Sequence, residues 1–119
     1  MGYRGDILKK EIVDKAVKYI EDNYYRTDIS LGKVSKETSL SYYYLSHIFK
    51  IYCETSFIEY LTKIRLCEAV KLLENPRLNI AQIAFAVGYN DRGYFTKVFK
   101  KAYKVSPAKF REKLLKRRK

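Results

Sequence analysis

The chain has 119 residues, 47% of them hydrophobic, which is enough for one domain or for two very small subdomains that share a helix. It contains only 5 glycines and 2 prolines, which argues against collagen-like sequence and low-complexity disorder. Its 25 lysines and arginines outnumber its 13 acidic residues and give a net charge of +12.

The positive charge is concentrated at the C-terminal end. Residues 97–119 hold eleven basic residues and one acidic residue, Glu112, so they carry +10 of the +12, and residues 1–96 carry the remaining +2. A basic segment of this kind predicts a polyanionic partner. For residues 116–119 a solvated basic tail is an equally good interpretation.

The residue types needed for catalysis or metal binding are scarce. Cys53 and Cys67 are too far apart for a C-x-x-C site, and we expect both to be reduced. The only histidine, His47, lacks partners for a metal site or a catalytic triad. No phosphate-binding glycine loop or paired-carboxylate site occurs, so we expect neither an enzyme nor a cofactor.

No apolar run approaches the roughly 18 residues of a membrane span, and no signal peptide opens the chain. We therefore expect a cytoplasmic protein without a membrane partner.

Helical periodicity runs through nearly the whole sequence, and we find no convincing strand. The first helix is predicted over 7–24. Ser30 can cap a short helix that ends near Thr38, and Ser41 can cap the next one. That third helix runs to about residue 52, and its predicted inward face is formed by Leu45, Ile48, Phe49 and Tyr52.

A long amphipathic helix is predicted over 56–74, and it ends before Pro76 because the residue preceding a proline disfavours helix. Gly88 follows a further short helix and supplies a turn with positive φ. The caps predicted for the last three helices are Asn79, Asp91 and Ser106. In the helix after Asp91 the predicted inward residues are Phe95, Val98, Phe99 and Ala102. The fold class is therefore all-α, with seven helices.

One pattern occurs twice in the chain. Residues 41–51, S-Y-Y-Y-L-S-H-I-F-K-I, correspond to residues 91–101, D-R-G-Y-F-T-K-V-F-K-K, at an offset of 50. Before the turn the offset is 49, because one extra residue near Asn90 lengthens the second turn. Each unit is a short helix, a tight turn and a second helix, which is the helix-turn-helix pattern. The predicted parts are a first subdomain over 7–55, a linker helix over 56–75, a second subdomain over 76–115 and a basic tail over 116–119.

In such a unit the second helix enters the major groove of DNA, with one face on the core and the opposite face toward the bases. The candidate stripe in the first unit is Tyr43, Ser46, His47 and Lys50, and in the second it is Gly93, Thr96, Lys97 and Lys100, with Arg92 at the entry. Lys50 and Lys100 are expected to contact phosphates, whereas Tyr44 and Tyr94 are expected to be partly buried packing residues.

The predicted 19-residue linker helix spans roughly 28 Å. Adjacent turns of the major groove lie about 34 Å apart, and a small bend of the DNA would make up the difference. One chain could then place two reading helices in successive major grooves, and we expect a monomer.

Four segments carry a family resemblance: Y-Y-L-S-H-I-F-K (43–50), S-F-I-E-Y-L-T-K-I-R-L-C-E-A-V-K-L-L (56–73), I-A-Q-I-A-F-A-V-G-Y-N-D-R-G-Y-F-T-K-V-F-K-K (80–101) and S-P-A-K-F-R (106–111). On these residues the chain resembles the DNA-binding region of bacterial AraC/XylS-type transcription regulators, over about 7–115. The resemblance implies two helix-turn-helix units, a long linking helix and sequence-specific binding to promoter DNA.

Carried over from the family, the base-reading positions fall on Tyr43, Ser46 and His47, and on Arg92, Gly93, Thr96 and Lys97. The chain departs from the family pattern where arginine is common, at His47 and Lys97, and where a small hydroxyl is common, at Gly93. The glycine usual at position 54 is replaced by Glu54, which predicts a strained helix end.

Two other functions compete with this interpretation. A basic helical RNA-binding protein would explain the charge and the tyrosines but not the doubled unit. A protein-interaction module would not explain the charge of +10 carried by residues 97–119. The family usually places a sensing domain before this region, so the chain is either a fragment of a larger regulator with a sensor or receiver domain, or a stand-alone regulator, and RNA polymerase is the expected further partner.

Overall fold

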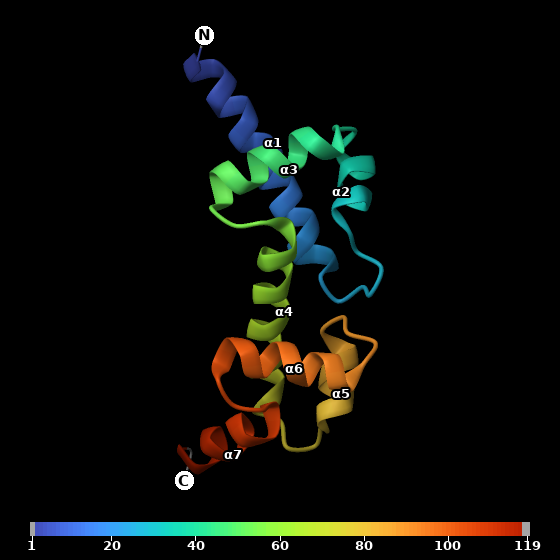
Figure 1. The fold of residues 1–119 in the computed structure, drawn as a ribbon, viewed down its shortest axis with the longest axis vertical. Helices are drawn as coiled ribbons and strands as arrows, with labels where there is room; N and C mark the ends of the chain where they lie inside the picture. The colour runs from blue at the N-terminus through green and yellow to red at the C-terminus, as the bar shows by residue number, and fades with distance from the viewer. Residues whose placement is uncertain (1, 118–119) are drawn as a thin grey trace. The chain divides into compact units, whose positions relative to one another are not determined.

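In a computed structural model the backbone of residues 2–117 and the side chains of residues 8–117 are described. Over that range the chain forms seven helices and no strand (Figure 1), which confirms the predicted all-α class. The helices are α1 (Gly2–Asn23), α2 (Leu31–Thr38), α3 (Tyr42–Cys53), α4 (Phe57–Leu73), α5 (Ile80–Ala86), α6 (Arg92–Tyr103) and α7 (Pro107–Arg117).

Two helix ends differ from the sequence-based expectation. Helix α1 begins at Gly2 rather than at Ile7, and α7 continues to Arg117, so the predicted basic tail is helical over its first two residues. The last two residues of that tail lie outside the described range. None of the described helices is both long enough and apolar enough to span a membrane.

The chain divides into two compact units. The N-terminal unit comprises Met1–Tyr24 and Asp28–Lys63, and the C-terminal unit comprises Tyr25–Thr27 and Ile64–Lys119. Helix α4 runs without a break from one unit into the other. In the N-terminal unit α1, α2 and α3 pack against one another, and in the C-terminal unit α6 packs against α5 and α7.

The core of the N-terminal unit follows the apolar periodicity of its helices. Phe49 is fully buried, and its ring makes edge contacts with Phe57 at 6.3 Å and with Tyr60 at 5.5 Å between centroids. Such pairs contribute about 0.5–1.5 kcal/mol beyond their buried area. The other buried apolar residues of α1 to α3 are Val13, Ala16, Ile20, Leu31, Val34, Leu45 and Ile48.

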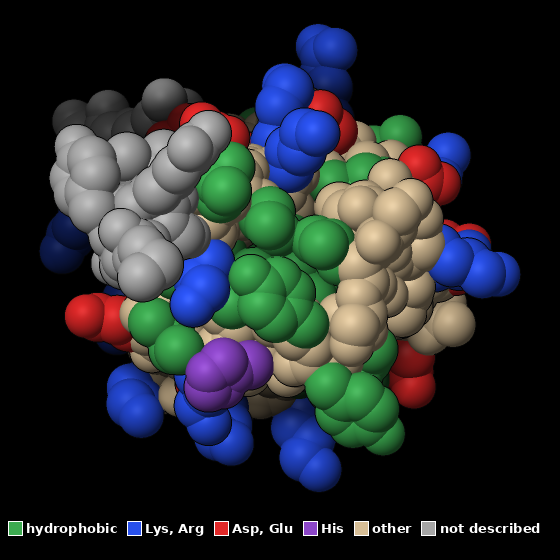
Figure 2. Space-filling model, turned by 90° about the horizontal axis from the view of Figure 1, so that it is seen from above, with side chains coloured by type: hydrophobic (Ala, Val, Ile, Leu, Met, Phe, Trp, Pro, Cys, Tyr) green, Lys and Arg blue, Asp and Glu red, His purple; other side chains and the backbone are tan. Residues whose placement is uncertain are grey.

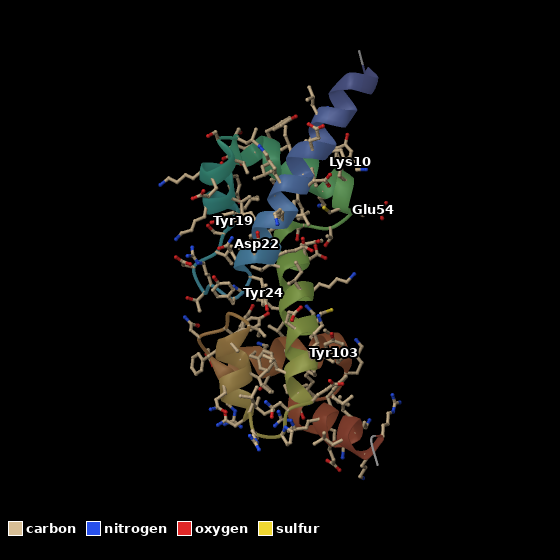
Figure 3. The ribbon with its side chains drawn as sticks, turned by 180° about the vertical axis from the view of Figure 1, so that it is seen from behind. Lys10, Tyr19, Asp22, Tyr24, Glu54 and Tyr103 are labelled. Carbon is tan, nitrogen blue, oxygen red and sulfur yellow. The ribbon has the colours of Figure 1, made fainter. Side chains whose placement is uncertain are left out.

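The core of the C-terminal unit is an aromatic cluster. The Phe99 ring lies 4.6 Å from that of Tyr103 and 5.5 Å from that of Phe110. Tyr103, labelled in Figure 3, faces α4, and burial followed by interaction with Cys67 raises the pKa of its hydroxyl. These contacts fix how α6 is rotated about its own axis.

Two arginines donate hydrogen bonds to backbone carbonyls, one in a loop and one at a helix end. Arg65 on α4 is only 8% exposed, its Nη2 donates to the Arg26 carbonyl at 2.7 Å, and its guanidinium carbon lies 5.1 Å from the Tyr89 ring centroid. Burial lowers the pKa of Arg65, and Tyr89 opposes that shift. Arg111 on α7 donates to the carbonyls of Leu73 and Asn75, where α4 ends.

The backbone repeats the doubled pattern of the sequence. Ser39 and Gly88, at an offset of 49, have φ of 57° and 108°, and Glu54 and Lys104, at an offset of 50, have φ of 58° and 72°. Glu54 therefore occupies the left-handed conformation that glycine usually takes, as the sequence predicts. Caps at Ser30, Ser41, Asn79 and Asp91 are all confirmed, since each side chain accepts a hydrogen bond from the following turn.

Four residues that the sequence predicts to be buried or partly buried are exposed instead, so those predictions are wrong. Tyr94 is 57% exposed and Tyr44 is 38% exposed, because each precedes a buried residue by one position and so lies about 100° around the helix from it. Ala102 and Tyr52 are also exposed. The residues after them, Tyr103 and Cys53, are the partly buried ones at that end of each helix, since Tyr103 packs on Phe99 and Phe110.

Candidate nucleic-acid interface

The first candidate surface is the outer face of α3. Ser41 caps the helix by accepting from the Tyr44 amide, and the buried Leu45, Ile48 and Phe49 fix its inner face. The opposite side is consequently exposed, and it carries all four predicted residues, Tyr43, Ser46, His47 and Lys50.

Among residues 8–117, whose side chains are described, Tyr43 is the most exposed large hydrophobic residue, at 83%, and its ring meets that of Tyr42 edge-on at 5.6 Å. Figure 2 looks onto the N-terminal unit and shows the chain's single histidine, in purple, exposed beside a group of hydrophobic side chains. This face can supply aromatic contacts, one hydroxyl, one imidazole and one ammonium group.

The second candidate surface is the outer face of α6. Asp91 Oδ1 accepts from the amides of Gly93 at 2.8 Å and of Tyr94 at 3.2 Å, and the buried Phe95 and Phe99 anchor the inner face. Of the predicted residues on the outer face, Thr96 is half-buried and Gly93, Lys97 and Lys100 are exposed, while Arg92, also exposed, stands at the first position of the helix.

The glycine at position 93 has a local explanation. A Cβ at Gly93 would lie 3.2 Å from Asp91 Oδ1, a closer approach than most Cβ atoms make. A side chain there would crowd the aspartate cap, so the absence of one leaves room for the cap and leaves the first turn of α6 open.

Each unit thus brings its own predicted set onto one exposed helix face, at spacings of i, i+3, i+4 and i+7. Such a face can offer hydroxyl, imidazole and ammonium groups to base edges and phosphates at once.

A hollow of about 290 Å³ adjoins the face of α3. It lies between the beginnings of α2, α3 and α4. Tyr42 and Ile58, 50% and 64% exposed, line it together with Ser46. The sequence favoured Tyr43 over Tyr42 as a contact residue and gave Ile58 no role. The sequence repeat could have indicated Tyr42, because at the offset of 50 it corresponds to Arg92, which was predicted to contact DNA.

The two cysteines are not among the residues of either candidate face. Cys53 at the end of α3 is partly buried and Cys67 on α4 is exposed, and both are free thiols. Burial, followed by the charge of Asp14, raises the pKa of Cys53. Among the described residues no three potential metal ligands lie together.

A family model described as a helix-turn-helix domain matches residues 34–113 of this chain. Among curated proteins, the chain is 32% identical over 106 residues to the probable transcription factor PqrA of Proteus vulgaris, covering 88% of this chain and 87% of that protein. It is 33% identical over 99 residues to the arabinose operon regulatory protein of Escherichia coli, covering 83% of this chain but only 34% of that protein.

Among solved structures, the chain resembles the C-terminal domain of AraT, a response regulator from Geobacillus stearothermophilus. The TM-score is 0.84 at 40% sequence identity, and the match covers 86% of this chain and 84% of that domain. The seven helices described above therefore have a close counterpart in the C-terminal domain of a response regulator.

Proposed function

Because this chain belongs to the AraC/XylS family of helix-turn-helix transcription regulators, we propose that it binds specific double-stranded DNA sequences at promoters and thereby regulates transcription. The observation that carries the proposal is the presence of two equivalent, capped helices, α3 and α6, each with a solvent-exposed polar stripe. The chain acts as a binding module and not as an enzyme.

We propose that base contacts come from Tyr43, Ser46 and His47 on α3, and from Arg92, Gly93, Thr96 and Lys97 on α6. Lys97 would approach the acceptor edge of a guanine as a single charge, without the two-pronged contact of arginine. The hydroxyls of Ser46 and Thr96 can pair with either donors or acceptors. Lys50 and Lys100 would hold phosphates and so fix the register of each helix.

The two helices would read successive turns of the major groove. What supports this idea is that both units lie on one chain. Adjacent turns of the major groove are about 34 Å apart, and bending the DNA to suit the protein costs a few kcal/mol. On this proposal the chain binds as a monomer, with subdomains over 7–55 and 76–115 and a linker over 56–75.

The wider setting also belongs to the proposal. We propose a cytoplasmic regulator that contacts RNA polymerase. A preceding sensor or receiver domain would control it, as the AraT match to the C-terminal domain of a response regulator suggests.

Competition binding tests this function against the RNA-binding alternative. A labelled 30-bp mixed-sequence duplex is bound by the chain, and unlabelled DNA duplex or RNA of the same sequence is titrated in. We expect DNA to displace the label at lower concentration, and Lys97→Ala to weaken binding on the order of 1 kcal/mol.

The matched control is Lys18→Ala on α1, whose side chain is 78% exposed and pairs with Asp22. It should leave the affinity unchanged. Equal or stronger displacement by RNA, or a Lys97→Ala affinity equal to that of the parent chain, would contradict the proposal.

A further inference from the structure

The two reading helices differ sharply in charge. Helix α3 with its C-cap contains one lysine, Lys50, and one glutamate, Glu54, for a net charge of zero. Helix α6 with its C-cap contains five basic residues and no acidic one, for a net charge of +5. The two helices have the same length, a side-chain N-cap and a left-handed C-cap, yet they present very different electrostatic surfaces even when the acidic N-cap of α6, Asp91, is counted.

The charge difference between α3 and α6 lies on their outer, exposed faces. At about 100° per residue, Lys97, Lys100 and Lys104 lie on the side of α6 opposite to the buried Phe95 and Phe99. We call Lys97, Lys100, Lys101 and Lys104, all exposed, the basic edge.

The same positions on α3 are His47, Lys50, Ile51 and Glu54. Glu54 and Lys104 correspond closely, because both are C-caps in the left-handed conformation, with φ of 58° and 72°. Figure 3 labels Glu54 at the end of α3, where the chain turns toward α4. An acidic side chain therefore lies at the end of the exposed stripe of α3 that is proposed to contact DNA.

Helix stability does not account for this asymmetry. Lysines near a helix C-terminus are favoured by the helix dipole by about 0.3–1 kcal/mol, but α3 has the same dipole and ends in a glutamate.

The first turn of α7 also carries a positive charge where the corresponding turn of α4 carries a negative one. In α4 the Glu59 carboxylate accepts from the Ser56 hydroxyl at 2.9 Å, in the first helical turn where acidic residues are favoured. In α7 the corresponding residue is Lys109, whose charge the dipole disfavours and which pairs with the exposed Glu112 at 3.8 Å. This lysine adds positive charge to the C-terminal unit in place of the capping interaction that Glu59 makes in α4.

We infer that the two units divide DNA binding unequally, an inference that rests on the proposed function. The C-terminal unit supplies most of the sequence-independent affinity through phosphate contacts of Lys100, Lys101 and Lys104 on the basic edge, while Lys97 keeps its proposed base contact. The N-terminal unit adds little sequence-independent affinity, because its stripe is uncharged overall and Glu54 repels phosphates. It contributes selectivity through Tyr43, Ser46 and His47. Salt dependence and non-specific affinity should therefore reside mainly in α6.

Salt titrations of charge variants test this division. Dissociation constants are measured on a 30-bp mixed-sequence duplex between 50 and 200 mM salt. Lys104→Ala should reduce the slope of log K against log salt by about 1, so that affinity falls about 4-fold less across this range. Glu54→Lys should raise that slope by about 1 and tighten non-specific binding.

Lys104→Arg should keep the parent slope, and Lys18→Ala is the surface control. Thermal melting of each variant separates loss of binding from loss of folding. An unchanged slope in Lys104→Ala, or unchanged non-specific affinity in Glu54→Lys, would overturn the division while leaving the proposed function intact. If the parent chain shows no salt-dependent binding to the duplex, both the division and the proposed function fail.

Discussion

At the scale of single residues, Arg65 connects parts of the chain that lie far apart in sequence. Its guanidinium reaches the Arg26 carbonyl, 39 positions earlier, and lies over the Tyr89 ring, 24 positions later. A nearly buried guanidinium is tolerated because its Nη2 donates to the Arg26 carbonyl and its face lies over the Tyr89 ring. The side chain thus holds the loop before α2 and the turn before α6 on one helix.

Arg65→Ala should lower the free energy of unfolding on the order of 2 kcal/mol, because the Arg26 carbonyl loses its donor and the Tyr89 ring loses its cation. Urea denaturation followed by circular dichroism measures the change. Lys18→Ala, at an exposed site, should stay within about 0.5 kcal/mol of the parent chain. An Arg65→Ala variant as stable as the parent would show that these contacts are not stabilising.

Residue-level prediction from the sequence was uneven for physical reasons. Tyr43 and His47 were placed correctly on an exposed face, because helical periodicity fixes the side opposite to Leu45 and Phe49. Arg65 was missed because its partners come from distant loops, which no local pattern encodes. Tyr94 was misplaced because a shift of one residue turns a side chain by about 100° around the helix.

At the scale of helices and turns, the caps decide where each unit begins and ends. All the predicted cap residues that the structure describes accept an amide of the following turn, since Ser, Asn and Asp are the side chains that reach it. Local chemistry therefore predicted the starts of α2, α3, α5, α6 and α7 well. The start of α1 was predicted late, because no cap or turn residue marks it.

The turn between α5 and α6 gives a test at this scale. Gly88 has φ of 108°, which a residue with a Cβ rarely adopts, so Gly88→Ala should lower the free energy of unfolding by about 1–2 kcal/mol. Ser39, its counterpart in the first unit, has φ of 57°, so Ser39→Gly should relieve strain there and stabilise the chain slightly. Thermal melting compares the two. A Gly88→Ala variant that melts at the parent temperature would show that this turn relaxes without cost.

At the scale of the whole molecule, a doubled unit on one chain offers two reading helices with different chemistry. The net charge of +12 draws the protein to any duplex, and its concentration after residue 97 assigns most of that attraction to the C-terminal unit. The discrimination proposed for α3 depends on uncharged side chains and one imidazole, and it adds to the base contacts proposed for α6. Sequence alone could predict the doubled unit and the charge gradient, but not that Glu54 lies on the reading stripe with the backbone of a C-cap.

The central claim is that one chain reads two separate blocks of bases, and selection from a random-sequence DNA pool tests it most directly. The pool is bound at moderate salt with excess non-specific competitor, and the retained duplexes are sequenced. We expect an enriched site with two short blocks about one helical turn apart, roughly 10 bp, with Lys97→Ala relaxing one block and His47→Ala relaxing the other. Retained DNA without any enriched sequence, or one block that both variants relax, would contradict the claim.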